Sequence, residues 1–272
     1  MIPRRMPMNE HPKTIVAFTQ LQRSYHNHVL HYMIFFIITG LPLLSTSFSF
    51  LASLFAIPYD FLGSAYPVLS ASGLTDNERL SAGLQVARVI HRITALLFVV
   101  HTIPFVVVQL IHVRSWAIWP EDSWGPAALF RGIKGLWVNY VCFGHVRIGK
   151  FNVGQKLFAW TMILAVTAIT LSGFALMFRG HFPEGGQEFS RFVHAASFVV
   201  IGVFLIVHLY LALLPMNRQS LYAMFRDGGL PVDYVRSHHA IWYENLTGKK
   251  GIDPKPAEKA EQSVADGKLT TS

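Results

Sequence analysis

The sequence is poor in cysteine and in charged residues. Its 272 residues include one cysteine, Cys142, so the chain can form no internal disulfide and no thiolate cluster for zinc or an iron–sulfur centre. Charged side chains make up 14% of the chain, whereas ordinary soluble domains carry about 25%. This composition excludes a disulfide-rich secreted domain, a disordered chain and a typical soluble enzyme.

Long apolar runs take the place of the missing charge. Hydrophobic residues form 52% of the chain, and 21 of them are phenylalanine. A membrane-spanning helix needs about 20 apolar residues. Four stretches are long enough: 29–50 with an extension to 57, then 86–111, 157–178 and 192–214. The sequence therefore predicts an all-α integral membrane protein, a four-helix bundle.

Basic residues predict its orientation. Eighteen of the 23 Lys and Arg residues lie before the first run, between the second and third, or after the fourth. The positive-inside rule then places both termini in the cytoplasm, with the four spans among membrane lipids. Because the net charge of +8 lies in loops beside apolar runs, no nucleic-acid partner is expected.

The same patterns divide the chain into three parts. We expect a cytoplasmic segment over 1–22, which lacks the pattern of a signal peptide, a membrane domain over 23–246, and a disordered tail over 247–272, which is polar and charged towards its end. Residues 64–84 are predicted to form an outer loop and residues 116–150 an inner loop along the membrane surface.

Histidines are the chemically informative residues of the apolar runs. His194 and His208 lie 14 residues apart in the fourth run. On a helix this spacing puts both side chains within about 40° of one another and roughly 21 Å apart along the axis. Neutral imidazole is an axial ligand of haem iron. The spacing therefore suits two haems, one near each membrane face.

Each haem needs a second ligand at the same level. The predicted topology puts His91 at the outer end of the second span and His26 at the inner end of the first. It therefore pairs His91 with His194 outside and His26 with His208 inside. Alternatives remain, because His28 and His31 compete with His26, and His101, which shares a helix face with His112, competes with His91. Five other histidines are expected in loops: His11, His145, His181, His238 and His239.

Several motifs resemble one membrane protein family. Residues 151–156 read FNVGQK, and the pattern Arg-x-x-His ends at His26, followed by Gly40, and again at His91. His194-Ala-Ala and His208-Leu-Tyr keep the family's spacing, and the segments 224–229 and 235–243 resemble its C-terminal end. Across most of residues 20–246 the chain resembles the gamma (cytochrome b) subunit of membrane-bound respiratory formate dehydrogenase.

That resemblance implies a location in the bacterial cytoplasmic (inner) membrane, together with cofactors and partners. It implies two b-type haems on His26, His91, His194 and His208. It also implies a cytoplasmic site for menaquinone or ubiquinone around Asn152 and Gly154. An iron–sulfur subunit and a molybdenum or tungsten catalytic subunit are expected at the outer face. The primary substrate chemistry then lies in a partner chain, and this chain transfers electrons and reacts with quinone.

The residues of the FNVGQK segment also have a direct physical interpretation. Asn152 and Gln155 offer amide groups at a helix start, where free N–H groups favour a quinone oxygen. Gly154 allows a ring to approach the backbone, and Lys156 can extend to the membrane interface. The alternative is a plain helix entry with Asn152 as the N-cap.

Other functions fit parts of the pattern. The cytochrome b subunits of hydrogenase and of thiosulfate or polysulfide reductase complexes share the general plan. A transporter whose membrane histidines titrate is an alternative of a different class, and it predicts no haem. A purely structural anchor would tolerate loss of His194 and His208.

Overall fold

The computed structural model of the chain describes residues 14–57, 75–120, 125–142 and 146–251. Four helices are long and apolar enough to cross a membrane: α1 (Gln20–Leu44), α3 (Asp76–Ile111), α5 (Val153–Met177) and α6 (Glu184–Leu213). The all-α fold with four membrane spans is thus confirmed. Side chains such as Val100, Ile111 and Ile206 stay exposed on these helices, as expected for surfaces that face lipid.

The remaining elements are short. In chain order they are β1 (Thr14–Val16), η1 (Thr46–Leu51), η3 (Val113–Ser115), α4 (Pro126–Tyr140), η4 (Arg179–His181), η5 (Pro215–Asn217), α7 (Arg218–Phe225), β2 (Gly229–Pro231), α8 (Val232–His238) and α9 (Ala240–Thr247). The apolar helix after α1 covers Thr46–Ile57, so the extension to residue 57 exists as a separate short helix.

The helices begin earlier than the apolar runs predicted. The largest difference is in α3, which begins at Asp76, so the prediction of an outer loop is wrong for residues 76–84. The cause is a capping box: the Thr75 side chain accepts from the backbone N–H of Glu78, and the Glu78 carboxylate accepts from the N–H of Thr75. Residues 64–74 and the predicted tail from residue 252 lie outside the described residues.

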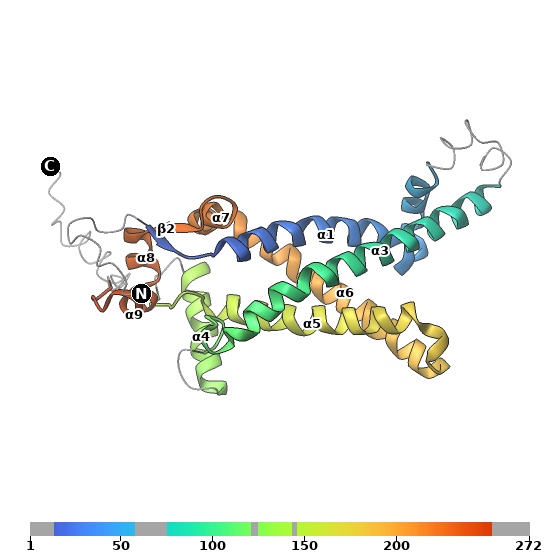
Figure 1. Cartoon of the computed structure of the whole chain (residues 1–272). Helices are drawn as coiled ribbons and strands as arrows, with labels where there is room; N and C mark the ends of the chain where they lie inside the picture. The colour runs from blue at the N-terminus through green and yellow to red at the C-terminus, as the bar shows by residue number, and fades with distance from the viewer. Residues whose placement is uncertain (1–13, 58–74, 121–124, 143–145, 252–272) are drawn as a thin grey trace, which may run out of the picture. The chain divides into compact units, whose positions relative to one another are not determined.

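The chain forms two compact units. The first, named here the α1–α3 unit, comprises Gln20–Val113 and Val166–Val200. In it α1 and α3 run side by side, as Figure 1 shows. Tyr25 of α1 stacks on Phe105 of α3 with 3.9 Å between ring centroids. Gly83 brings α3 so close to the backbone carbonyl of Ala52 that a larger residue would collide with it.

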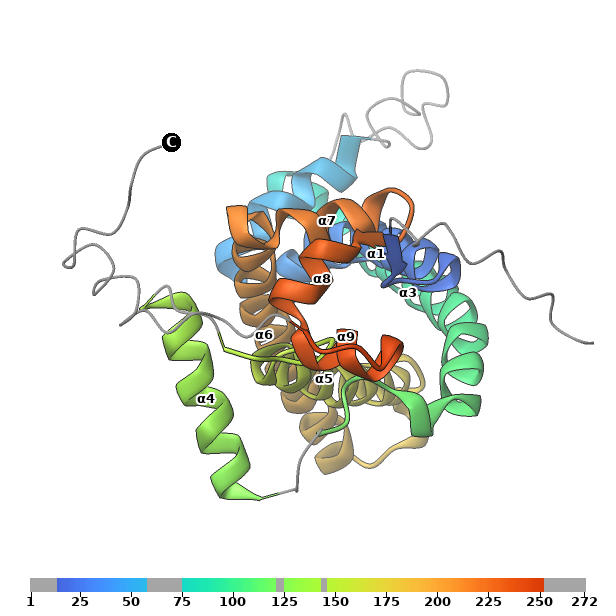
Figure 2. The ribbon, with the colours of Figure 1, turned by 90° about the vertical axis from the view of Figure 1, so that its left-hand side faces the viewer.

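The second unit, named here the terminal unit, comprises Met1–Thr19, Arg114–Ala165 and Ile201–Ser272. Strand β1 pairs antiparallel with β2, with Ile15 opposite Leu230. The small core under this pair contains the buried side chains of Ala223, Val235 and Tyr243. Figure 2 shows the same end of the chain with α8 and α9 next to one another. The segment before the first span is thereby joined to the segment after the fourth.

Candidate functional site

Two of the predicted ligands face one another inside the α1–α3 unit. His91 lies on α3 and His194 on α6, and their ring centroids are 6.3 Å apart in an edge-on arrangement with 69° between the ring planes. Each ring is half-buried. The two residues are more than a hundred positions apart in sequence, so the fold and not local structure brings them together.

His91 is held by the facing surface of α1. Its Nδ1 lies 2.9 Å from Oγ1 of Thr39, a side chain that is 1% exposed. A Cβ on the next residue, Gly40, would lie 3.4 Å from Cε1 of His91. Phe36 contacts the same ring edge-on, with centroids 5.3 Å apart. The imidazole is thus fixed by a hydroxyl, a glycine and an aromatic ring from one helix.

His194 is held in the same way by α5. Its Nδ1 lies 3.1 Å from the backbone oxygen of Ile169 and 3.3 Å from Oγ of Ser172. A Cβ on the next residue, Gly173, would lie 3.1 Å from Cε1 of His194. A hydroxyl residue followed by glycine therefore supports each of the two imidazoles.

The spacing of this pair fits a haem iron between the rings. Two imidazoles on opposite sides of one metal, each bound through a nitrogen at about 2 Å, have centroids roughly 6 Å apart. The observed 6.3 Å matches that requirement. No group of three or more His, Cys, Asp or Glu side chains that could hold a bare metal ion occurs among the described residues. The donor set therefore suits a metal whose other ligands come from a porphyrin.

A different spacing separates His101, the alternative to His91, from His28. His101 lies 4.7 Å from His28 between ring centroids, which is too close for an iron to fit between the rings as they stand. His101 also stacks on Tyr25 at 5.8 Å. Nδ1 of His31 lies 2.7 Å from the backbone oxygen of Asn27 one turn before it. The geometry favours His91 over His101 as the partner of His194.

The other two predicted ligands lie in different units. His26 is near the start of α1, and His208 is in the terminal unit on the part of α6 after Ile201. His208 stacks on Phe158 of α5, with 4.9 Å between centroids and 17° between planes. Because α6 is one continuous helix, His194 and His208 have the axial spacing that the sequence predicted. The pairing of His26 with His208 stays a prediction.

The predicted quinone segment forms the start of α5. Asn152 is buried, and its Oδ1 accepts from the backbone N–H of Gln155, while Oε1 of Gln155 accepts from the backbone N–H of Asn152. This reciprocal pair is a helix cap, so the N-cap interpretation of Asn152 is confirmed. A Cβ on Gly154 would lie 3.1 Å from Leu136 of α4, and Lys156 follows in the first turn. A quinone contact by these residues is not tested by this geometry and stays a prediction.

Beside this cap lies a cationic side chain enclosed by aromatic rings. Nζ of Lys150 is 5.4 to 5.7 Å from the ring centroids of Phe18, Phe151 and Trp242. Burial among these rings lowers the pKa of the Lys150 ammonium from its usual range. A narrow cavity of about 40 Å³ runs past Lys150 and Gln155. The side chains at the start of α5 thus have a small internal space beside them.

His239, from the C-terminal segment, also lines that cavity. It is 8% exposed, and its Nδ1 lies 2.9 Å from the backbone oxygen of Gly149. Burial lowers the pKa of His239, and the positive charge of Lys150 lowers it further, whereas the hydrogen bond to Gly149 opposes the shift. The prediction that His239 is a simple loop residue is therefore incomplete, because this turn between α8 and α9 is buried.

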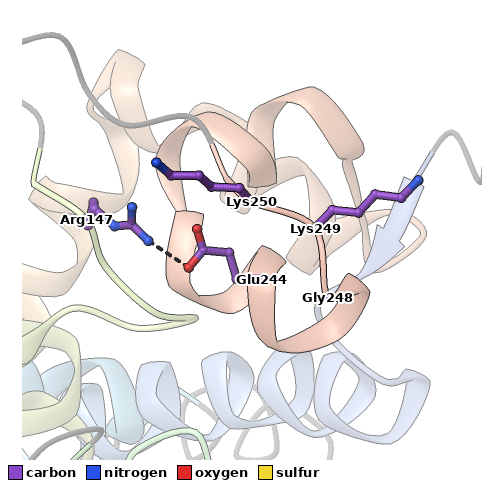
Figure 3. A pocket seen from close by; sticks show the side chains of 5 residues that line it. All are labelled: Arg147, Glu244, Gly248, Lys249 and Lys250. Carbon is purple, nitrogen blue, oxygen red and sulfur yellow. Dashed lines mark hydrogen bonds and ion pairs between the residues drawn. The ribbon is translucent and has the colours of Figure 1, made fainter.

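A basic hollow of about 400 Å³ lies on the outside of the same segment. Arg147 and Glu244 form an ion pair of 2.7 Å across it, and Lys249 and Lys250 line its rim, as Figure 3 shows. The backbone N–H of Ile241 also donates to the oxygen of Ile148. Through these contacts the segment after His238 packs against the end of the predicted inner loop.

Sequence reasoning missed the hydroxyl residues that contact the two imidazoles and two of the residues that line the cavity beside α5. Thr39 and Ser172 are ordinary hydroxyl residues inside apolar runs, and Lys150 and His239 lie outside the spans. The one available signal was the small residue after each hydroxyl, Gly40 and Gly173. Glycine lowers the stability of a helix, so a glycine inside a membrane span indicates that another group approaches the backbone closely at that position.

Comparison with known proteins identifies the family of the chain. The profile of the prokaryotic cytochrome b561 family matches residues 18–227. The nitrate-inducible formate dehydrogenase cytochrome b556(Fdn) subunit of Escherichia coli (strain K12) is 24% identical over 102 residues, 36% of this chain and 46% of that protein. The formate dehydrogenase cytochrome b556 subunit of Haemophilus influenzae is 28% identical over 98 residues, 35% of this chain and 40% of that protein.

A third relative is the formate dehydrogenase cytochrome b556(fdo) subunit of Escherichia coli (strain K12), 26% identical over 102 residues, 36% of this chain and 46% of that protein. The aligned part spans less than half the length of these relatives. Because the family profile covers most of the chain and four helices can span a membrane, the chain is a multi-pass protein of the bacterial inner membrane that binds haem b. It belongs to the prokaryotic cytochrome b561 family.

Proposed function

We propose that this chain is the membrane cytochrome b subunit of a formate dehydrogenase-type complex. In it, electrons from an iron–sulfur subunit at the outer face reach a quinone at the cytoplasmic side. The relatives named above are formate dehydrogenase subunits, which supports formate as the primary electron source. Oxidation of formate itself belongs to a molybdenum or tungsten partner chain at the outer face.

Two haems b would supply the reversible one-electron carriers of this subunit. His91 and His194 would hold one, and their facing rings at 6.3 Å are the observation that carries the proposal. His26 and His208 would hold the other. All four side chains are half-buried, and the low polarity of the membrane interior favours the neutral imidazole that can bind the metal.

The start of α5 would receive the quinone. The reciprocal cap of Asn152 and Gln155 fixes the first turn of α5 beside the cavity that Lys150 lines. The first N–H groups of this helix point towards its positive end, which favours a carbonyl oxygen that gains negative charge. With the basic segments in the cytoplasm, the protons that complete the quinol come from that side, so electron entry and proton uptake lie on opposite faces.

The test is purification of the complex from the membranes of its host through a tag on this chain. Copurified chains are identified by mass spectrometry, and the haem spectrum is followed after formate, hydrogen, thiosulfate or a quinol is added. We expect an iron–sulfur chain, a molybdenum or tungsten chain, and reduction of the haem bands by formate. Reduction by hydrogen or by a quinol but not by formate would reassign the complex. A folded chain without haem would contradict the proposal altogether.

A further inference from the structure

The hydroxyl groups of Thr39 and Ser172 indicate which nitrogen of each imidazole carries the proton. Thr39 donates its single hydroxyl proton to the backbone oxygen of Phe35 at 2.6 Å. Its oxygen can therefore only accept in the 2.9 Å contact with Nδ1 of His91. The proton of neutral His91 is then on Nδ1, and the lone pair is on Nε2.

The same reasoning applies to His194. The backbone oxygen of Ile169, 3.1 Å from Nδ1, can only accept, so Nδ1 of His194 carries the proton. Ser172 donates to the backbone oxygen of Ala168 at 2.7 Å and is a second acceptor for His194 at 3.3 Å. Both rings therefore have the tautomer in which Nε2 can bind a metal.

The two imidazoles differ in the number of hydrogen-bond acceptors that contact Nδ1. Within the part of the chain that the structure describes, Nδ1 of His91 has one acceptor, Thr39, which is 1% exposed. Nδ1 of His194 has two, and the closer one is a backbone oxygen that no side-chain substitution removes. Loss of a hydroxyl therefore leaves His91 without a partner but leaves His194 with one.

We propose that Thr39 and Ser172 are positioning residues for a haem held by His91 and His194, and that His91 depends on its hydroxyl more than His194 does. The inference rests on the proposed function for the identity of the bound group. An acceptor on Nδ1–H raises the donor strength of a ligating imidazole and fixes its orientation. Its loss therefore weakens haem binding and raises the reduction potential, because the oxidised iron gains most from a strong donor.

The experiment compares purified complexes that carry Thr39→Val, Thr39→Ser and Ser172→Ala. Haem retention is measured by competition with apo-myoglobin, and the potential of each haem by spectroscopic titration. Outer-shell ligand substitutions lower metal affinity roughly 10- to 100-fold, and we expect Thr39→Val to fall in that range with a shift to higher potential. Thr39→Ser should restore both values, and Ser172→Ala should give the smaller change.

A matched control is Thr94→Val. Thr94 is also buried, at 7% exposed, and lies on α3 one turn from His91. The signal of the haem that does not involve His91 serves as an internal reference for folding. If Thr39→Val fails to assemble, Thr39→Ala, which removes the same hydroxyl with less bulk, takes its place.

Three outcomes separate the possibilities. Equal haem retention and potential in Thr39→Val, or its Ala replacement, and Thr94→Val would overturn the positioning role and leave the proposed function intact. A larger effect from Ser172→Ala than from Thr39→Val would overturn the asymmetry. If His91→Ala removes no haem from a folded complex, His91 is not a haem ligand, and the positioning role of Thr39 falls with it while the proposed function stands.

Discussion

Replacement by alanine should have different effects at the two glycines that face the imidazoles, Gly40 and Gly173. Alanine is more stable than glycine inside a helix by about 0.5–1 kcal/mol. At Gly40 the new Cβ would lie 3.4 Å from Cε1 of His91, the inner limit of ordinary contact. At Gly173 it would lie 3.1 Å from Cε1 of His194, where the ring has to move by a few tenths of an ångström.

The sign of each stability change depends on whether the cost of overpacking exceeds the gain in helix stability. Overpacking of a fixed core costs about 1–3 kcal/mol, which equals or exceeds the helix gain. The His194 ring cannot yield freely, because Nδ1 is bound to Ile169 and Ser172. Gly40→Ala should therefore keep or slightly raise the free energy of unfolding with an unchanged haem spectrum. Gly173→Ala should be neutral or destabilising and should shift the ligand-field signals of one low-spin haem.

The assay is thermal unfolding of the purified complex together with low-temperature electron paramagnetic resonance of the oxidised haems. Gly202→Ala is the control, since Gly202 lies on α6 with no atom within 4 Å of the new Cβ among the described residues. Gly202→Ala should show only the increase in helix stability that alanine gives over glycine. The reasoning is refuted if Gly40→Ala shifts a haem signal more than Gly173→Ala, or if neither variant differs from Gly202→Ala.

Three further predictions concern other parts of the chain. Gly83→Ala should lower the unfolding midpoint by roughly 4–10 °C, equivalent to about 2–3 kcal/mol, because the backbone of Ala52 cannot move aside. Differential scanning fluorimetry measures the midpoint, and an unchanged value would contradict the close packing of α3 against Ala52. Asn152→Asp keeps an oxygen to cap α5 but loses the amide donor, so the free energy of unfolding should stay the same while the KM for the quinone rises. An unchanged KM would mean that Asn152 acts only as a cap. Because the pKa of His239 in the folded protein lies below the ordinary histidine value of about 6.5, the unfolded segment binds a proton more readily than the folded one. The folded segment therefore loses stability as the pH falls below about 6.5. Hydrogen exchange in α8 and α9, corrected for its intrinsic pH dependence, should therefore be faster at pH 5.5 than at pH 7.5, and His239→Asn should remove that difference.

The sequence was sufficient for what depends on local pattern. The four spans follow from runs of apolar residues. That His194 and His208 lie on the same side of α6 follows from the periodicity of the helix. The helix starts were predicted too late, because polar first turns such as that of α3 are stabilised by caps and not by hydrophobicity. The N-cap at Asn152, which the sequence offered as the alternative to a quinone contact, also depends on a local pattern.

The sequence could not predict what depends on contacts between helices. Whether His91 or His101 faces His194 is decided by the rotation of α3 against its neighbours, and both histidines lie on apolar helix surface. The hydroxyl of Thr39 gains its role only because α1 crosses α3 at that level. The burial of His239 likewise depends on a partner, the carbonyl of Gly149, that is 90 positions away.

The central claim is that two histidine pairs hold two haems, and haem quantification in single-histidine variants tests it most directly. Pyridine haemochrome spectra, normalised to protein, should give about two haems b per chain in the unmodified protein. His91→Ala and His194→Ala should each remove the same haem, identified by its potential, and His26→Ala and His208→Ala should each remove the other. One haem per chain, or loss of the same haem in His91→Ala and His208→Ala, would contradict the account.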